Sequence, residues 1–395
     1  TAHGMTKEQE YLISLLAAYI SGEKIILQPD TDFRQLFATA KIHNLACPVF
    51  CAISGAENAN EINENLFAKY QGAFLDSVYI NNMQMQIFGE IKKLFCAEGI
   101  KFVPFKGAVL RELYPDPEAR TMGDIDLLIE KGRQKQVKKL LCESGFECTV
   151  CGGGEWVYTK GGVIAEIHTS LISGKIGGSS ADAFFENAIS KAEFNGCEGH
   201  FPAQYHFEYI LAHLAHHFGN CGAGIKMVLD LAVMLKAGGI SIEAAEADFE
   251  EMGLGKFSKI LLAICKKWFG YGKECEYPTQ KTEDFIASHG AFGNVSRNKA
   301  VVVERTKLAR GSAKGGFSAK LALLFPSYEE MCALSYIRFL KGRRWLTPLA
   351  WAIRFFKNLF CRRKDMMRLA KEIGSNENTA AAREELEYYK EIGLL

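Results

Sequence analysis

Two aspartates at the start of an apolar stretch have the right type and spacing to bind a metal ion. Asp124 and Asp126 are separated by one residue, and Leu127, Leu128 and Ile129 follow them. Because successive side chains of a β-strand point to opposite faces, both carboxylates would lie on the same face. Two carboxylates on one face repel each other unless a cation lies between them, so the pair predicts a Mg²⁺ site. The alternative interpretation is an acidic pair on an exposed strand edge, without an ion.

A later segment offers a third carboxylate. Val163 to His168 alternates in a way that predicts a strand with Glu166 and His168 on one face. If this strand lies beside the one that carries Asp126, Glu166 joins the aspartates at the same ion. The pattern then predicts a metal site of two Asp and one Glu.

The segment before the aspartates is typical of an anion-binding turn. A short apolar strand is expected over 101–105, and it ends at Lys106 and Gly107, where a helix begins. Such a turn points backbone N–H groups and the positive end of a helix at an anion. The neighbouring segments therefore favour a metal site over an isolated acidic pair.

The same region carries a series of motifs in a fixed order. They are Phe105-Lys106-Gly107-Ala108, Tyr114-Pro115-Asp116-Pro117, Arg120-Thr121-Met122-Gly123-Asp124-Ile125-Asp126-Leu127-Leu128-Ile129, Glu166-Ile167-His168-Thr169-Ser170-Leu171, His213-Leu214-Ala215-His216-His217-Phe218 and Lys226-Met227-Val228-Leu229-Asp230. Together they resemble the uncharacterised nucleotidyltransferase family of the DNA polymerase β-like superfamily. The resemblance runs from about residue 30 to residue 235 and is specific over 105–129. It departs from the superfamily at the turn, which is usually Gly-Ser or Gly-Gly and is Lys106-Gly107-Ala108 here.

The resemblance implies a reaction and a set of site residues. The enzyme would move NMP from an NTP substrate to an acceptor, with two Mg²⁺ ions (or Mn²⁺), in-line attack at the α-phosphorus and release of pyrophosphate. The implied catalytic and metal residues are Asp124, Asp126 and Glu166. The implied nucleotide-binding residues are Lys106, Gly107, Arg120 and His168. Candidates for the acceptor or nucleotide pocket are His213, His217 and Asp230.

Several of these residues also have a purely structural interpretation. Lys106 can be a solvated lysine, and Arg120 can simply pair with Asp116 or Glu118. Asp230 can pair with Lys226, four residues before it.

A histidine cluster on a predicted helix was weighed as a zinc site. His206, His213 and His217 are seven and four residues apart, so they share one helix face. The His-Glu-x-x-His pattern of zinc proteases is absent, which argues against zinc and favours packed or nucleotide-facing histidines.

The order of the predicted elements indicates an α+β protein with a small mixed-sheet, polymerase β-like core between helical regions. We expect an N-terminal helical region over 5–76, the nucleotidyltransferase core over 77–172 and a C-terminal helical region over 173–395. Residues 173–180 read as a mobile loop. Helices are expected after it at 204–218, 224–237, 241–252, 255–268, 328–341 and 348–373.

The charge of the chain is unevenly distributed. The 395 residues carry a net charge of +1, so a surface that is basic all over is excluded. Residues 338–371 nevertheless hold eleven Lys and Arg against one Asp, and 372–395 are acidic. An apolar helix face at positions 346, 349, 353, 356 and 360 runs through the basic segment. It predicts either a core helix with a solvated edge or a surface for an acidic partner, RNA or an anionic membrane.

The cysteines and the apolar runs bear on the compartment. The twelve Cys lack a zinc spacing, so we predict reduced thiols, no structural disulfide and no structural zinc in a cytoplasmic protein. The first apolar run follows acidic residues, and we expect no signal peptide. Charged residues interrupt every long apolar run, and we expect no transmembrane segment.

Three functions remain open from the sequence. The first is an active nucleotidyltransferase that modifies a small molecule, a peptide or a protein. The second is a catalytically silent nucleotide- or partner-binding protein that keeps the fold. The third is an RNA-end nucleotidyltransferase, which only the basic segment favours. No motif identifies the acceptor.

Overall fold

The structure, a computed structural model, describes most of the chain. The described residues are 4–152, 154–172, 176, 178–220, 222–291, 343–361 and 376–395, together with isolated positions between 325 and 340. The chain divides into two compact units, one of residues 1–150 with 154–295 and one of residues 151–153 with 296–395. All the predicted site residues lie in the first unit. The boundaries expected at residues 76 and 172 stay predictions.

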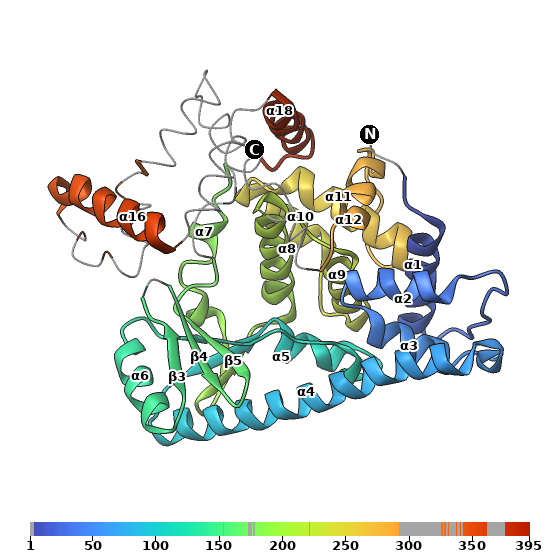
Figure 1. Cartoon of the computed structure of the whole chain (residues 1–395), viewed down its shortest axis with the longest axis horizontal. Helices are drawn as coiled ribbons and strands as arrows, with labels where there is room; N and C mark the ends of the chain where they lie inside the picture. Colours follow the sequence, from blue (N-terminus) through green and yellow to red (C-terminus); the bar gives the residue numbers. More distant parts are fainter. Residues whose placement is uncertain are drawn as a thin grey trace. The chain divides into compact units, whose positions relative to one another are not determined.

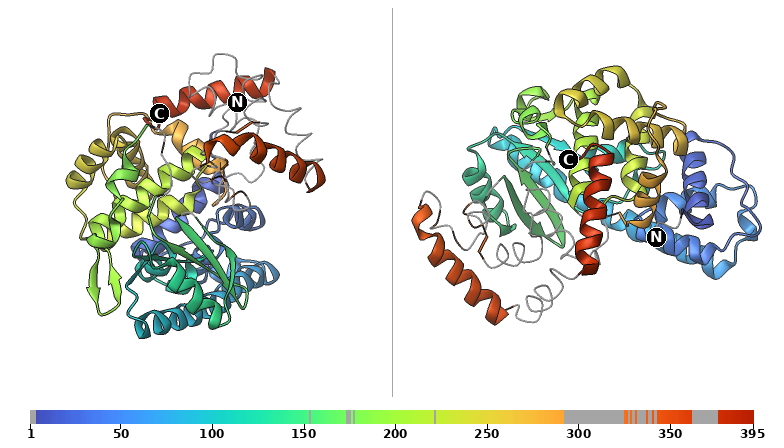
Figure 2. Two further views of the ribbon diagram at one scale, coloured as in Figure 1. Left: turned by 90° about the vertical axis from the view of Figure 1, so that its left-hand side faces the viewer. Right: turned by 90° about the horizontal axis from the view of Figure 1, so that it is seen from above.

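Four helices precede the sheet in the first unit. They are α1 (Lys7–Ser21), α2 (Phe33–Ile42), α3 (Ala46–Ser54) and the 34-residue α4 (Glu64–Ala97). A capping box in which Thr6 and Gln9 satisfy each other's backbone N–H groups starts α1. α4 extends from the N-terminal helices to the sheet (Figures 1 and 2). Its last turns contribute Ile91 and Phe95 to the apolar core beneath the strands.

Seven strands form one mixed sheet in the order β3-β4-β5-β2-β1-β7-β6. Their bounds are β1 Phe102–Phe105, β2 Ile125–Ile129, β3 Glu147–Val150, β4 Glu155–Lys160, β5 Val163–His168, β6 Glu193–Asn195 and β7 Glu198–His200. β2 pairs antiparallel with β1 and parallel with β5, and the strands β3 to β5 form an antiparallel meander. The sheet and its helical surroundings confirm the predicted α+β class.

The remaining helices of the first unit follow β1 in the chain. They are α5 (Gly107–Leu110), α6 (Gln134–Glu143), α7 (Ala181–Phe184), α8 (Ala203–Asn220), α9 (Ile225–Ala237), α10 (Ile242–Met252), α11 (Gly255–Phe269) and α12 (Gln280–Ser288). The helices predicted between 204 and 268 are confirmed within a few residues at their ends. The loop predicted over 173–180 lies partly outside the described residues.

The hairpin of β6 and β7 was not predicted, although its turn carries a signal. Figure 2 (left) shows it as a small yellow-green ribbon, and β7 pairs with β1 to extend the sheet. Its strands have three residues each, too few for an alternating pattern to stand out. Asn195-Gly196 at its turn is a common hairpin signal and could have indicated it.

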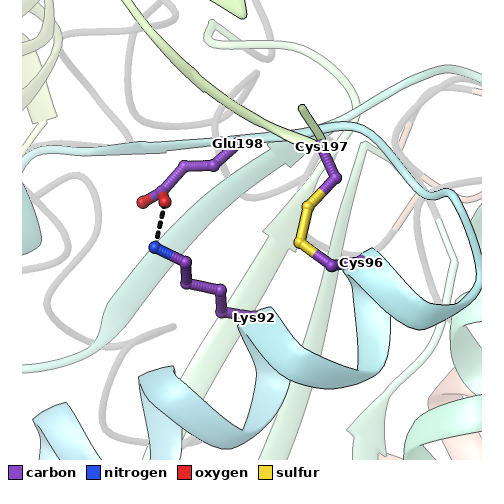
Figure 3. The surroundings of a disulfide bond; sticks show 4 residues. All are labelled: Lys92, Cys96, Cys197 and Glu198. Atoms are coloured by element: carbon purple, nitrogen blue, oxygen red, sulfur yellow. Dashed lines mark ion pairs between the residues drawn. A yellow bond between two sulfur atoms is a disulfide. The ribbon is translucent and has the colours of Figure 1, made fainter. Parts of the chain in front are cut away.

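A disulfide joins this hairpin to the end of α4 and corrects the prediction that the chain has none. Cys96 and Cys197 are bonded, with their Cα atoms 5.4 Å apart. An ion pair between Lys92 and Glu198 lies beside the bond (Figure 3). The prediction failed because 101 residues separate the two cysteines, and only the pairing of β7 with β1 brings them together.

The second unit contains α16 (Thr347–Cys361) and α18 (Asn376–Glu391). A small core of Met331, Ile337, Leu340 and Ala350 forms there, and Leu346 packs against it. Leu349 and Ile353, which belong to the predicted apolar face of α16, are exposed. Phe356 and Phe360, and most of the helix predicted over 328–341, lie outside the residues whose side chains are described. No helix in the described part of the chain is long and apolar enough to cross a membrane.

Candidate functional site

The turn after β1 forms one side of the site. Lys106 has a φ of 51°, in the left-handed region that non-glycine residues rarely adopt. Gly107 then starts α5, and a Cβ there would lie 2.9 Å from the Cγ of Met122, so a larger residue would require that side chain to move. The backbone N–H of Lys106 donates to the Nε2 of His206, 3.3 Å away on α8. A strained lysine at a tight turn is thus fixed by a contact from a distant helix.

The strand register brings the acids together. β2 and β5 run parallel, and Asp126 lies directly opposite Glu166. Asp124 immediately precedes β2. Asp126 is buried, with only 1% of its surface exposed. The sheet therefore holds the carboxylates of Asp126 and Glu166, whereas Asp124 lies in the bend before β2. The prediction that Glu166 lies on a strand beside the aspartates is confirmed.

Two basic side chains contact the central aspartate. The Nζ of Lys106 lies 2.8 Å from the Oδ1 of Asp126, and the Nε2 of His168 lies 3.0 Å from the same oxygen. The Nε2 of His168 also lies 3.5 Å from the Oε2 of Glu166. Both contacts with Asp126 use Oδ1.

The protonation of the acids differs because their neighbours differ. Burial, followed by the charges of Asp126 and Glu166, raises the pKa of Asp124 to about 7. Burial alone would also raise the pKa of Asp126, but the charge of Lys106 and the hydrogen bond from His168 outweigh it and lower the pKa. Burial would lower the pKa of His168, but its hydrogen bonds to Asp126 and Glu166 raise it to about 9. Asp126 is therefore a charged, ion-paired carboxylate. Asp124 has no such partner among the described residues, and its burial and the negative charges of Asp126 and Glu166 disfavour its ionisation.

These side chains line a cavity of about 450 Å³ between the sheet and helices α8 and α9. Its volume lies within the range of pockets that bind small molecules. Each predicted site residue contributes to the wall: Lys106, Gly107, Arg120, Asp124, Asp126, Glu166, His168, His213, His217 and Asp230. The structure therefore brings the whole predicted set to one cavity, although it gives some members other partners than we expected.

Arg120 and Asp230 form a buried ion pair on the helical side of the cavity. The guanidinium binds the carboxylate through two hydrogen bonds of 2.8 and 2.9 Å, and Tyr114 donates to the same carboxylate at 2.8 Å. Neither Asp116 nor Glu118, the alternative partners predicted for Arg120, occupies this place. Nor is Lys226 the ion-pair partner of Asp230 that the sequence offered. These pairings form between residues about 110 positions apart, which spacing along the chain does not reveal.

Two histidines of α8 face the same cavity. The Nε2 atoms of His213 and His217 lie 3.0 Å apart. Burial, followed by the charge of Lys106, lowers the pKa of His213 well below its usual value, and burial with His216 lowers that of His217 to about 4. Both imidazoles are neutral at pH 7, so the helical wall offers hydrogen-bonding groups without charge.

Lys226 is a cavity residue that the sequence argument did not select. It lies in the first turn of α9, and its Nζ donates to the backbone carbonyl of Thr121 at 3.0 Å. The available signal was weak, because a lysine in an otherwise apolar helix start can equally point to solvent.

The donor set fits a divalent cation. One ligand atom each from Asp126, Glu166 and His168 lie within 4.8 Å of one another. Carboxylate oxygens are the ligands that Mg²⁺ and Mn²⁺ prefer. His168 takes the place in this group that the prediction gave to Asp124, and it would have to release its Nε2 proton to bind a metal. The crowding that raises the pKa of Asp124 is the strain that a cation would relieve.

The comparison of sequences identifies the family. The model of an uncharacterised nucleotidyltransferase family matches residues 29–270, which is more than half of the chain. The chain belongs to this family. The match confirms the resemblance inferred from the motifs between residues 105 and 230. A search of curated proteins gave no significant match, and neither did a search of solved structures.

The two walls of the cavity carry different groups. Its sheet wall carries the acids and the glycine turn, and its helical wall carries histidines, a buried ion pair and Lys226. The family is uncharacterised, so the individual roles of these residues follow from their geometry alone.

Proposed function

We propose that the protein is a Mg²⁺-dependent nucleotidyltransferase that moves NMP from an NTP to a nucleophilic acceptor and releases pyrophosphate. The observation that carries this proposal is the register of β2 and β5. It sets Asp126 opposite Glu166, beside Asp124 and His168, in a cavity that also contains the Gly107 turn. Membership of the nucleotidyltransferase family supports the same reaction class.

Asp126 and Glu166, with Asp124 at the start of the strand, would hold the divalent cation. When bound, the cation supplies Lewis-acid neutralisation of the phosphate charge and orients the reacting oxygens. The protein fixes the acids on two neighbouring strands, so little reorganisation is needed when the nucleotide arrives.

The chain's own residues have separable tasks in this proposal. The Gly107 turn and the start of α5 place backbone N–H groups and a positive helix end near the phosphates. His168 orients Asp126 through its hydrogen bond, and Lys106 keeps that carboxylate ionised. When a cation binds Asp126, the ammonium of Lys106 becomes available to a phosphate oxygen, which is the nucleotide-binding role predicted for it.

Incubation with radiolabelled NTPs, Mg²⁺ and a cell extract tests the proposal. Wild-type protein should transfer label from one NTP to an acceptor that can then be isolated and identified. Asp126→Asn should abolish the transfer. Asp76→Asn, an exposed aspartate on α4 remote from the cavity, serves as the matched control and should transfer at the wild-type rate.

The catalytically silent alternative makes the opposite prediction. It expects NTP and Mg²⁺ to raise the melting temperature with no labelled product under any acceptor mixture. If neither binding nor transfer occurs with any NTP, the enzyme and the silent nucleotide-binding protein are both wrong, and a partner-binding protein that keeps the fold remains.

A further inference from the structure

Some basic side chains of the cavity already have an acidic partner, and one has none among the residues that the structure describes. Four basic side chains that are charged at pH 7 line its wall: Lys106, Arg120, His168 and Lys226. His168 contacts Asp126 at 3.0 Å. Lys106 pairs with Asp126 at 2.8 Å, and two hydrogen bonds join Arg120 to Asp230. Within the described part of the chain, Lys226 has no ion pair, and its Nζ donates only to a backbone carbonyl.

The surroundings of Lys226 make its charge costly without an anion. Burial, followed by the charge of Arg120, lowers the pKa of Lys226 to about 8, although Asp230 and Asp124 oppose this shift. The side chain is therefore still mainly protonated at pH 7. Lys226 is half-buried and lies in no ion pair with the described residues, so its charge is only partly compensated and an anion that enters the cavity gains an interaction there.

The position of Lys226 in its helix adds to the same field. It is the second residue of α9, a helix of 13 residues whose N-terminal Gly224 provides no side-chain cap. The positive end of the helix dipole and the ammonium thus favour negative charge at the same end of the cavity. Carboxylates of the acid cluster lie on the sheet side, so the anion would lie between the two walls.

We propose that Lys226 binds the terminal phosphates of the nucleoside triphosphate, in place of the phosphate role that the sequence suggested for Arg120. The identity of the ligand as a nucleotide rests on the proposed function. The existence of a polyphosphate site at Lys226 does not, because it follows from the position and charge of this lysine in the cavity. Arg120 is a positioning residue that holds Asp230 and the wall of the cavity. Its Nε and Nη2 are both engaged by Asp230, so the pair already neutralises most of its charge.

A second lysine on the same helix provides a matched control. Lys236 also donates to a backbone carbonyl, that of Ile20, but it lies at the other end of α9 and does not line the cavity. Lys226→Met and Lys236→Met therefore remove the same side-chain chemistry from one helix, and only the first removes charge from the cavity.

The experiment measures binding by titration calorimetry with Mg²⁺ and each of NTP, NDP and NMP. Lys226→Met should weaken NTP binding by about tenfold to a hundredfold, the value expected for a lost hydrogen bond to a charged group. NMP binding should change by less than about threefold, since NMP lacks the terminal phosphates. Lys226→Arg should restore part of the loss, and Lys236→Met should bind all three like wild type.

Inorganic tripolyphosphate separates the two proposals. If wild type binds tripolyphosphate through Lys226 but binds no NTP, the proposed function fails while the anion site stands. If Lys226→Met, shown by circular dichroism to be folded, binds NTP and tripolyphosphate like wild type, the inference about Lys226 is overturned. An equal loss of NMP and NTP binding would also overturn it, because it would indicate a disturbed cavity and not a lost phosphate contact.

Discussion

The two walls of the cavity are built on different principles. The sheet wall concentrates ionised groups within hydrogen-bonding distance, with Lys106, His168 and Glu166 around Asp126. The helical wall holds one ion pair, Arg120 with Asp230, together with the ammonium of Lys226 and the neutral imidazoles of His213 and His217. The first arrangement suits a metal ion and chemistry, and the second suits recognition of a substrate.

The difference shows in the direction of the pKa shifts. On the sheet wall, burial and then the charges of Asp126 and Glu166 raise the pKa of Asp124 to about 7. On α8, burial lowers the pKa of His206 and of the cavity residue His217 to about 4. Burial therefore favours the neutral form of an acid on one side and of bases on the other, and repulsion among carboxylates adds to the shift only on the sheet wall.

The largest expected effect is on catalysis, and it tests the division of labour between the walls. Asp126→Asn should lower the transfer rate by about a thousandfold or more, because it removes a ligand charge at the site of phosphate transfer. His217→Asn should change the KM of a substrate more than the rate. Steady-state kinetics of both variants decides the matter. If His217→Asn lowers the rate as much as Asp126→Asn, the walls do not divide the work in this way.

The structure also changes what Asp126→Asn should do to the metal-free protein. Relief of the repulsion among the acids would by itself stabilise the variant slightly. Because Asp126 is the counter-ion of Lys106, the variant leaves a buried ammonium unpaired and should instead lower the melting temperature.

The next largest effect concerns the ion pair of the helical wall. Asp230→Asn should lower the free energy of unfolding by about 3–5 kcal/mol, because it leaves Arg120 buried without an anion. Urea denaturation measures the loss. The double variant Arg120→Met with Asp230→Leu should recover part of it. If Asp230→Asn were as stable as wild type, the ion pair would not be structural, and the phosphate-binding role predicted for Arg120 would be restored.

A smaller effect concerns the edge of the sheet wall. Replacing both Cys96 and Cys197 by Ser should lower the free energy of unfolding by about 2–4 kcal/mol, a usual value for losing a disulfide. A reductant should lower the melting temperature of wild type and leave the double variant unchanged. Titration of the unfolded, unreduced protein should count two thiols fewer than twelve. Equal thermal stability of wild type and double variant, with and without reductant, would contradict the bond.

The acid limb of the stability profile tests the helical wall. The pKa of His206 is about 4 in the folded state, from burial first and the charge of Arg120 second, against 6.5 for the free side chain. Its contribution is fully present above pH 6.5 and is lost as the pH falls toward 4, because only the unfolded state then binds the proton. The total is on the order of 3 kcal/mol.

Melting curves from pH 7 to pH 4.5 measure this contribution. His206→Gln keeps an acceptor for the N–H of Lys106 and should flatten the acid limb, whereas His200→Gln, at an exposed position, should not. An unchanged acid limb in His206→Gln would show that this histidine is not buried in its neutral form.

The smallest expected effect is on the stability of the metal-free protein, and it concerns Asp124 of the sheet wall. Since the folded-state pKa of Asp124 is raised, its contribution to metal-free stability is lost as the pH rises from about 4 to about 7. Asp124→Asn should remove this loss and stabilise the metal-free protein at pH 7.5 by about 1 kcal/mol, after solvent screening. Saturating Mg²⁺ should reverse the order of the two proteins. A variant less stable than wild type without metal would contradict the crowding of charge at Asp124.

The sequence by itself determined the sheet wall. Alternation along two apolar segments puts Asp126 on one strand face and Glu166 with His168 on another, because backbone geometry fixes where every second side chain points. That the two strands pair, and that Asp124 lies just before its strand, came from the structure. The turn at Gly107 was also predictable, since a glycine between a short strand and a helix is typical of a tight turn. The family resemblance rests on these same local patterns, and the family match confirms it.

Only the tertiary structure decided the helical wall and the edge of the sheet. The pairing of Arg120 with Asp230, the contact of His206 with Lys106 and the bond of Cys96 to Cys197 each join residues about 100 positions apart. Helix periodicity says which residues share a face, but it does not say what that face meets. The role of Lys226 follows from the same cause, because whether a lysine points to solvent or into a cavity depends on what the rest of the chain places around it.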